Sequence, residues 1–354
     1  MAGVLCIDGG MGHQLRRMGV TIEGKIGSLE RFLNVATANV NKPGLVEKAH
    51  VEFLKSGAQV ITTNSYACIP NVLANMDGGT GGKEVATHAD LEKYIVAAGK
   101  CASNAKRAWL GATGRTKNHA CTIAASIPPL NASYRHELVG KREVLNRDYK
   151  FITKTIAPYV DIFLCETMST IAEALAAGTA AAKFNKPVWV SFTVSDDSHQ
   201  LGRLRSGESI SHAVRECVNA IGPNLTAVLC NCSSPKSITV ATREIVETLT
   251  AMNLTHKIKV GAYANGFEAT EKLVEKIGVA ANRDTHISPH DCSASTSGEY
   301  RADLTPALYL KEVEKWVKLG ASIIGGCCGI FPEHIEAVSS HYHGKSKGYG
   351  GTKL

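Results

Sequence analysis

Hydrophobic and polar positions follow two alternating patterns along this chain. Short apolar runs rich in β-branched residues end in small or polar clusters, and each is followed by a longer segment whose apolar positions have helical spacing. This alternation predicts repeated β/α units. We expect eight strands, which are Val4–Gly10, Gln59–Tyr66, Thr122–Ile127, Asp161–Thr167, Pro187–Thr193, Leu225–Cys232, Lys257–Ala264 and Ala321–Cys327.

Amphipathic segments between these runs predict the helices. Eight parallel strands with interleaved helices are typical of a closed α/β fold, the (β/α)8 or TIM barrel. A doubly wound sheet is the alternative, but Gly9-Gly10-Met11-Gly12 lacks the G-x-G-x-x-G spacing that binds dinucleotides. The expected helices include Pro43–Ser56, Glu84–Arg107, Glu137–Ile156, Thr170–Phe184, Ser209–Ile221, Pro306–Leu319 and Pro332–Ser340.

The length of 354 residues permits one barrel domain over residues 1–343 and a flexible tail over residues 344–354. Two segments interrupt the alternation, Asp77–Gly82 and Glu268–Asp303, and both follow a strand. Since the carboxyl ends of barrel strands share one face, we expect these loops to decorate the C-terminal rim, where active sites form.

Composition describes an ordinary globular chain, with 44% hydrophobic and 20% charged residues. The net charge of +7 is spread along the sequence, which argues against a nucleic-acid partner. No apolar stretch approaches the roughly 20 residues that cross a membrane, and the first residues enter an expected strand without a basic n-region or cleavage site, so we do not expect secretion. We therefore expect a cytoplasmic protein, a monomer or weak homo-oligomer, although Thr352-Lys353-Leu354 loosely resembles a peroxisomal signal.

Cysteines close two of the expected strands. Cys232 ends the sixth, and Cys327 and Cys328 end the eighth within a glycine-rich motif, so the three sulfurs can converge at the rim. Neighbouring residues on a strand point to opposite faces, so the pair can share a metal only where the backbone leaves strand geometry. A vicinal disulfide is the alternative, disfavoured by its strain and by a reducing compartment. Cys230 is expected on the same strand face as Cys232, filling the barrel interior.

Three sulfurs at about 2.3 Å around a tetrahedral Zn²⁺ leave one position open, as in catalytic sites. A substrate thiol bound there would have its pKa lowered from roughly 8.5, so that the nucleophilic thiolate predominates. Such an anionic sulfur reacts best with a methyl group on a cationic leaving group, because charge is neutralised in the transition state. A sulfonium or quaternary ammonium donor fits this chemistry.

Polar residues end other expected strands. Asp8 and Glu166 are carboxylates that can bind an amino acid's ammonium group, while Asp8 can alternatively cap the helix that follows. Asn265 can occupy the fourth zinc position until substrate displaces it, or serve as an ordinary turn residue. None of the 13 histidines has the H-x-H or H-E-x-x-H spacing of a metal hydrolase.

With these residues the sequence resembles the homocysteine S-methyltransferase family over about Val4–Ser340. The resemblance implies zinc on Cys232, Cys327 and Cys328, and homocysteine bound by Asp8, Gly9, Thr63 and Glu166. The motifs that carry it are Asp8-Gly9-Gly10-Met11-Gly12, Gly57–Tyr66, Cys165-Glu166-Thr167, Asn231-Cys232 and Gly325-Gly326-Cys327-Cys328-Gly329.

The donor branch is indicated by two further segments. Ser191-Phe192-Thr193 and the stretch from Ser126 to Arg135 are similar to enzymes that use S-methylmethionine or S-adenosylmethionine, whereas Ala264–Glu268 departs from the Pro-Asn-Ser-Gly-Glu usual among them. The resemblance implies zinc-dependent methyl transfer from a sulfonium donor to homocysteine, giving methionine. The alternatives are a betaine-type donor, as in the related betaine-dependent enzymes, and a non-catalytic zinc-binding barrel.

Overall fold

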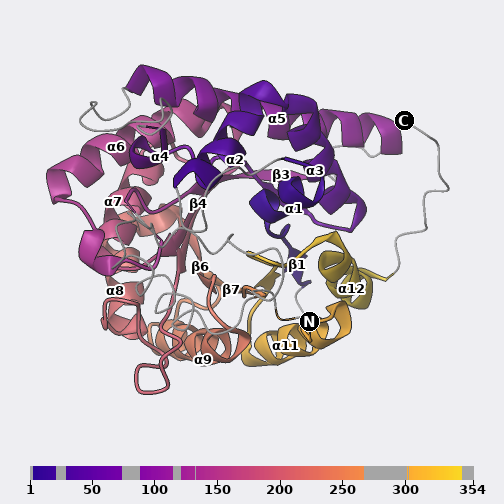
Figure 1. The fold of residues 1–354 in the computed structure, drawn as a ribbon. Helices are drawn as coiled ribbons and strands as arrows, with labels where there is room; N and C mark the ends of the chain where they lie inside the picture. The colour runs from indigo at the N-terminus through magenta and orange to yellow at the C-terminus, as the bar shows by residue number, and fades with distance from the viewer. Residues whose placement is uncertain are drawn as a thin grey trace, which may run out of the picture.

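The computed structural model describes residues 3–20, 29–73, 88–114, 121–131, 133–266, 301 and 303–344. Its eight strands are all parallel and form one sheet in the order β1-β8-β7-β6-β5-β4-β3-β2. Backbone bonds close the ring between β1 and β2, where Gln59 N donates to Cys6 O at 2.7 Å and Asp8 N donates to Val60 O at 3.0 Å. The helices surround the strands (Figure 1), so the predicted (β/α)8 barrel is confirmed.

The elements follow the predicted alternation. The strands are β1 (Leu5–Cys6), β2 (Val60–Thr62), β3 (Thr122–Ile127), β4 (Ile162–Met168), β5 (Val188–Phe192), β6 (Leu225–Asn231), β7 (Lys259–Tyr263) and β8 (Ile323–Ile324). The α-helices are α1 (Met11–Arg17), α2 (Leu29–Asn41), α3 (Pro43–Lys55), α4 (Pro70–Leu73), α5 (His88–Thr113), α6 (Arg142–Ile156), α7 (Ile171–Ala182), α8 (Ile210–Ile221), α9 (Pro235–Ala251), α11 (Pro306–Leu319) and α12 (Pro332–His343).

Several expectations differ in detail. The predicted strands at β1, β2 and β8 extend further at both ends than those observed, and the residues that follow each observed strand form the rim. The helix expected from Glu137 begins at Arg142, after a 3-10 turn over His136–Leu138. Three predicted segments lie outside the described residues. They are the rim loop Asp77–Gly82, the loop Glu268–Asp303 except for residues 301 and 303, and the tail beyond residue 344 with its C-terminal tripeptide. No described helix is long and apolar enough to span a membrane.

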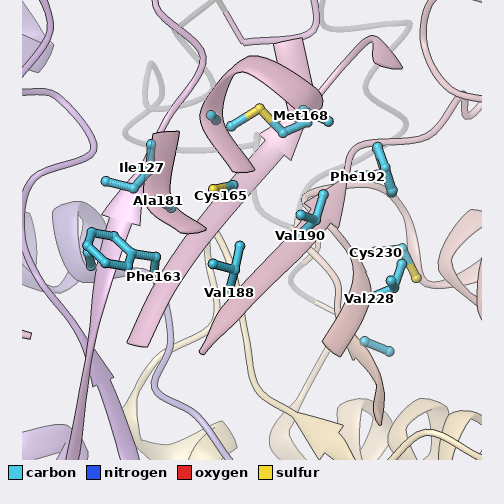
Figure 2. Packing of buried hydrophobic residues seen from close by; sticks show 14 of the residues in the cluster. Ile127, Phe163, Cys165, Met168, Ala181, Val188, Val190, Phe192, Val228 and Cys230 are labelled. Carbon is cyan, nitrogen blue, oxygen red and sulfur yellow. The ribbon is translucent and has the colours of Figure 1, made fainter. Parts of the chain in front are cut away.

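Two apolar layers lie on either side of the sheet. Strand alternation sends one set of side chains to the helices and the other into the barrel. Figure 2 shows part of the outer layer, in which Phe163, Val190 and Val228 pack on one face of their strands. The inner layer consists of Ile7, Val60, Ala124, Ile162, Leu164, Trp189, Ala227, Leu229, Tyr263 and Ile323.

Cys230 belongs to the outer layer, so the prediction that it fills the barrel interior is wrong. Its Sγ lies 3.4 Å from Thr242 Oγ1 on α9, and it appears beside Val228 in Figure 2. Cys232 nevertheless reaches the rim, because its backbone has a φ of 51° and no longer obeys strand alternation. Counting two residues back from Cys232 therefore gives the wrong face.

Candidate metal and substrate site

Three cysteine sulfurs meet at the rim of the barrel. Cys232 Sγ lies 2.7 Å from Cys327 Sγ and 3.8 Å from Cys328 Sγ, and the two neighbouring sulfurs are 4.0 Å apart. All ten described cysteines are free thiols, so the alternative of a Cys327-Cys328 disulfide does not hold. The structure thus brings together the three residues that the sequence singled out.

The end of β7 holds the two cysteine segments in place. Cys232 N donates to Tyr263 O at 3.2 Å, and Cys327 N donates to Ala264 O at 3.0 Å. Gly266 N in turn donates to Cys328 O at 2.7 Å. Strand β8 has already ended at Ile324, so Cys327 and Cys328 lie in a turn. Both side chains can therefore point towards the same site, which they could not do as neighbours on a strand.

The three thiols differ in acidity. Burial acts to raise the pKa of Cys232, but hydrogen bonds from Cys327, Cys328 and Tyr134 outweigh it and hold that pKa well below its ordinary value. The hydrogen bonds to Cys232 raise the pKa of both other thiols. Negative charge in the cluster therefore settles first on Cys232.

Glu166 is a buried carboxylate near the end of β4. Its Oε1 accepts a hydrogen bond from Ser126 Oγ at 2.5 Å, and its Oε2 accepts one from Tyr263 OH at 3.1 Å. Burial raises its pKa to about 7, against the effect of these hydrogen bonds. An ammonium group placed beside Glu166 would restore the charged form.

Asp8 does not cap the helix that follows it. Its Oδ2 accepts from Thr62 N at 2.7 Å, and its Oδ1 accepts from Thr62 Oγ1 at 3.1 Å, whereas α1 has Gly10 as its N-cap residue and no side-chain cap. Asp8 is only 2% exposed, and burial raises its pKa well above the ordinary value. The carboxylate thus faces the site from the start of the barrel.

The remaining predicted residues have different settings. Thr63 Oγ1 bonds to Ser65 Oγ at 2.8 Å and accepts from Ser126 N at 3.1 Å. Gly9 lies so close to Ile330 O that an added Cβ would be 2.4 Å away. Asn265 is buried just beyond β7, and its backbone N donates to Ser233 O at 3.1 Å.

One pocket joins these groups and encloses about 990 Å³, its open mouth included. Asp8, Gly9, Thr63 and Glu166 line it together with the three cysteines, whereas Asn265 is absent from its lining. Among the described residues that line the pocket, none is Lys or Arg. Its electrostatic character therefore favours positively charged ligand groups.

Sequence reasoning assigned no individual role to the residues that hold the predicted ones. Tyr263 and Ser126 bind Glu166, Thr62 binds Asp8, and Tyr134 OH lies 2.9 Å from Cys232 Sγ. Tyr263 and Ser126 lie at the ends of expected strands, so their position was a signal for them. Tyr134 comes from a loop whose path no local pattern gives.

The comparisons with known proteins indicate one family. The homocysteine S-methyltransferase family profile matches residues 5–342. Similar curated proteins include homocysteine S-methyltransferase 1 of Brassica oleracea var. italica, 27% identical over 95% of this chain and 93% of that protein. Another is homocysteine S-methyltransferase of Escherichia coli K12, 24% identical over 95% and 94%.

A solved structure shares the fold. The homocysteine methyltransferase MmuM from Escherichia coli, in its metallated form, has a TM-score of 0.70 at 20% identity and covers 96% of both chains. Because the family profile spans nearly the whole sequence, this chain is a member of the homocysteine S-methyltransferase family.

Proposed function

We propose that this protein transfers a methyl group from a sulfonium donor, S-methylmethionine or S-adenosylmethionine, to the sulfur of homocysteine, giving methionine. Zinc held by Cys232, Cys327 and Cys328 supports the reaction. The observation that carries this proposal is the meeting of three cysteine sulfurs and two buried carboxylates in one pocket. Family membership supports homocysteine as the acceptor.

The three sulfurs fit a zinc ion. In a tetrahedral site with zinc–sulfur bonds of about 2.3 Å, neighbouring sulfurs are about 3.8 Å apart. Two of the three sulfur–sulfur distances are 3.8 and 4.0 Å, and only the 2.7 Å pair of Cys232 and Cys327 must open. When bound, the ion would lower the pKa of the homocysteine thiol and hold the thiolate.

Homocysteine's amino-acid end is assigned to the carboxylates and the adjacent backbone. Glu166 accepts the ammonium group, and Asp8 lines the same pocket as a second carboxylate. The backbone at Gly9, which lines the pocket, receives the substrate carboxylate. Asn265 is buried beside the pocket without lining it, and its side chain would have to turn towards the sulfurs to hold the fourth ligand position before substrate arrives.

Charge in the pocket favours a cationic methyl donor. Two carboxylates line it, and none of its described lining residues is Lys or Arg. The homocysteine sulfur attacks the methyl carbon while the bond from that carbon to the donor sulfur breaks. The bonding pair stays on the donor sulfur, which leaves as a neutral thioether.

A betaine-type quaternary ammonium donor is the second candidate. The same charge argument applies to it, and a betaine-homocysteine S-methyltransferase of Drosophila melanogaster is 24% identical over 86% of both chains. A zinc-binding barrel without catalysis is disfavoured, because a metal store gains nothing from burying Asp8 and Glu166, whose desolvation is costly.

A donor panel tests the function. The zinc-loaded protein is incubated with homocysteine and, separately, with S-methylmethionine, S-adenosylmethionine or betaine, and methionine is measured. We expect methionine from a sulfonium, and loss of both zinc and activity in Cys327→Ser. Cys217→Ser, which alters a buried cysteine on α8 outside the pocket, is the matched control and should keep both. Full activity of zinc-free Cys327→Ser would refute the proposal.

A further inference from the structure

Tyr134 contacts the ligand sulfur of Cys232 directly. Its hydroxyl lies 2.9 Å from Cys232 Sγ, and the tyrosine is only 6% exposed. A cysteine that binds a metal does so as a thiolate and has no proton to give. The tyrosine must then be the donor of this hydrogen bond.

A buried ion pair supports Tyr134 from behind. The Arg205 guanidinium carbon lies 4.8 Å from the centre of the Tyr134 ring, and Arg205 pairs with Asp196 at 3.1 Å. Their side chains are 7% and 2% exposed. Asp196 Oδ1 also accepts from Ser234 N at 2.9 Å, two residues after Cys232. The segment between β5 and α8 therefore fixes both ends of the hydrogen bond.

Backbone strain is concentrated at the same place. Among the described residues, five other than glycine have a positive φ, and two of them are asparagines that follow helices. The others are Tyr134 at 67°, Thr167 at 62° and Cys232 at 51°. Such conformations are strained and persist where surrounding contacts impose them. Both partners of the hydrogen bond are held in this way.

The proposed reaction has a selectivity problem that this contact addresses. If zinc and homocysteine bind as proposed above, several anionic sulfurs meet near one reactive methyl group. Should Cys232 attack instead, an Sγ–methyl bond would form and the donor's sulfur–methyl bond would break, leaving a neutral thioether donor product and a methylated cysteine. Such a cysteine is a poor zinc ligand, so the enzyme would inactivate itself.

We propose that Tyr134 is a positioning residue that donates to Cys232 Sγ, makes this sulfur less nucleophilic, and so directs the methyl group to the substrate sulfur. A hydrogen bond to an anion withdraws electron density from it. The Arg205 cation stacked on the ring strengthens the phenol as a donor. This inference rests on the proposed function for the methyl transfer, but the hydrogen bond itself is testable without it.

The first experiment tests the hydrogen bond alone. Cobalt(II) replaces zinc in the wild-type protein, in Tyr134→Phe and in the control Tyr149→Phe. The Tyr149 hydroxyl, on α6, donates to Pro128 O at 3.0 Å, and Pro128 belongs to the same β3–α6 connection as Tyr134. Removing a donor from a ligand sulfur should move the sulfur-to-cobalt charge-transfer absorption to longer wavelength in Tyr134→Phe. Tyr149→Phe should retain the wild-type spectrum.

The second experiment tests where the methyl group goes. The zinc-loaded proteins are incubated with S-methylmethionine in the absence of homocysteine, and methylation of the peptide that contains Cys232 is followed by mass spectrometry. We expect methylation about tenfold faster or more in Tyr134→Phe, an intermediate rate in Arg205→Lys, and the wild-type rate in Tyr149→Phe.

The outcomes separate the two proposals. An unchanged cobalt spectrum in Tyr134→Phe overturns the hydrogen bond to the ligand sulfur. A shifted spectrum without faster Cys232 methylation overturns the role in directing the methyl group. If the wild-type protein makes methionine from none of the donors, the proposed function fails, whatever the spectrum shows.

Discussion

At the scale of single residues, two buried glutamates allow a controlled test of substrate binding. Burial raises the pKa of Glu166 and of Glu173 to about 7 in each case. Glu166 lines the pocket, whereas Glu173 lies on α7 and its Oε2 accepts from Ser169 N at 3.4 Å and Ser169 Oγ at 3.3 Å. The two carboxyls share an environment of low polarity and differ in access to substrate.

We predict that Glu166→Gln raises the KM for homocysteine about 30-fold, corresponding to about 2 kcal/mol, because the neutral amide no longer pairs with the ammonium group. Glu173→Gln should leave this KM unchanged. Steady-state kinetics at fixed donor concentration measure both. Equal KM values in the wild type and Glu166→Gln would remove Glu166 from the binding site.

The pH dependence of the same variant has a defined sign. Because the folded-state pKa of Glu166 lies above the unfolded value, ionising this group costs stability as pH rises from about 4.5 to about 7, and the cost of about 3 kcal/mol is complete above that range. Homocysteine binding should instead improve as pH rises towards 8. In metal-free protein, Glu166→Gln should therefore unfold at higher denaturant concentration than wild type at pH 8, with little difference at pH 4.

At the scale of elements, the repeating units were predictable and the rim geometry only partly so. Short apolar runs and segments of helical spacing identified the eight β/α units, because strands of a parallel sheet are buried on both faces and read as continuous apolar runs. Strand ends then indicated Asp8, Glu166 and the cysteines. Cys230 was misplaced because a positive φ at Cys232 is a tertiary effect that adjacent residues do not encode. Tyr134 was given no role because it reaches Cys232 from a loop whose path adjacent residues do not encode.

The turns after β1 and β8 interlock at the cysteine pair. Gly10 N donates to Ile330 O at 2.9 Å, and Gly326 N donates to Asp8 O at 2.9 Å. A Cβ on Gly10 would lie 2.8 Å from Cys327 O. The glycines after β1 are therefore required for close approach of the two backbones, and this approach places Cys327 and Cys328.

We predict that Gly9→Ala destabilises the protein by about 2–3 kcal/mol and weakens zinc binding, because its Cβ would meet Ile330 O at 2.4 Å. Gly12→Ala is the control: its Cβ would lie 3.5 Å from Val35 Cγ1, an ordinary contact, within α1. Alanine should stabilise that helix by roughly 0.5–1 kcal/mol. Denaturant unfolding and zinc titration measure both variants, and a harmless Gly9→Ala would contradict the interlocked turns.

At the scale of the whole molecule, the cysteine cluster joins distant parts of the barrel. Cys232 follows β6, the pair follows β8, and β7 lies between them in the sheet. In the sequence, 94 residues separate Cys232 from Cys327. An ion bound by all three sulfurs therefore links two strand ends that unfolding would separate, and its binding energy contributes to the stability of the folded chain.

We predict that zinc removal lowers the thermal midpoint by on the order of 5 °C, since a ligand at about 1,000 times its Kd stabilises by about 4 kcal/mol and a chain of this size shifts by only one or two degrees per kcal/mol. Differential scanning calorimetry with and without a chelator measures the shift. In Cys328→Ser the chelator should have little further effect, because one ligand is already lost. The same chelator-induced shift in wild type and Cys328→Ser would place the stabilising ion elsewhere in the protein, since a site lacking one of three ligands cannot bind zinc with unchanged affinity.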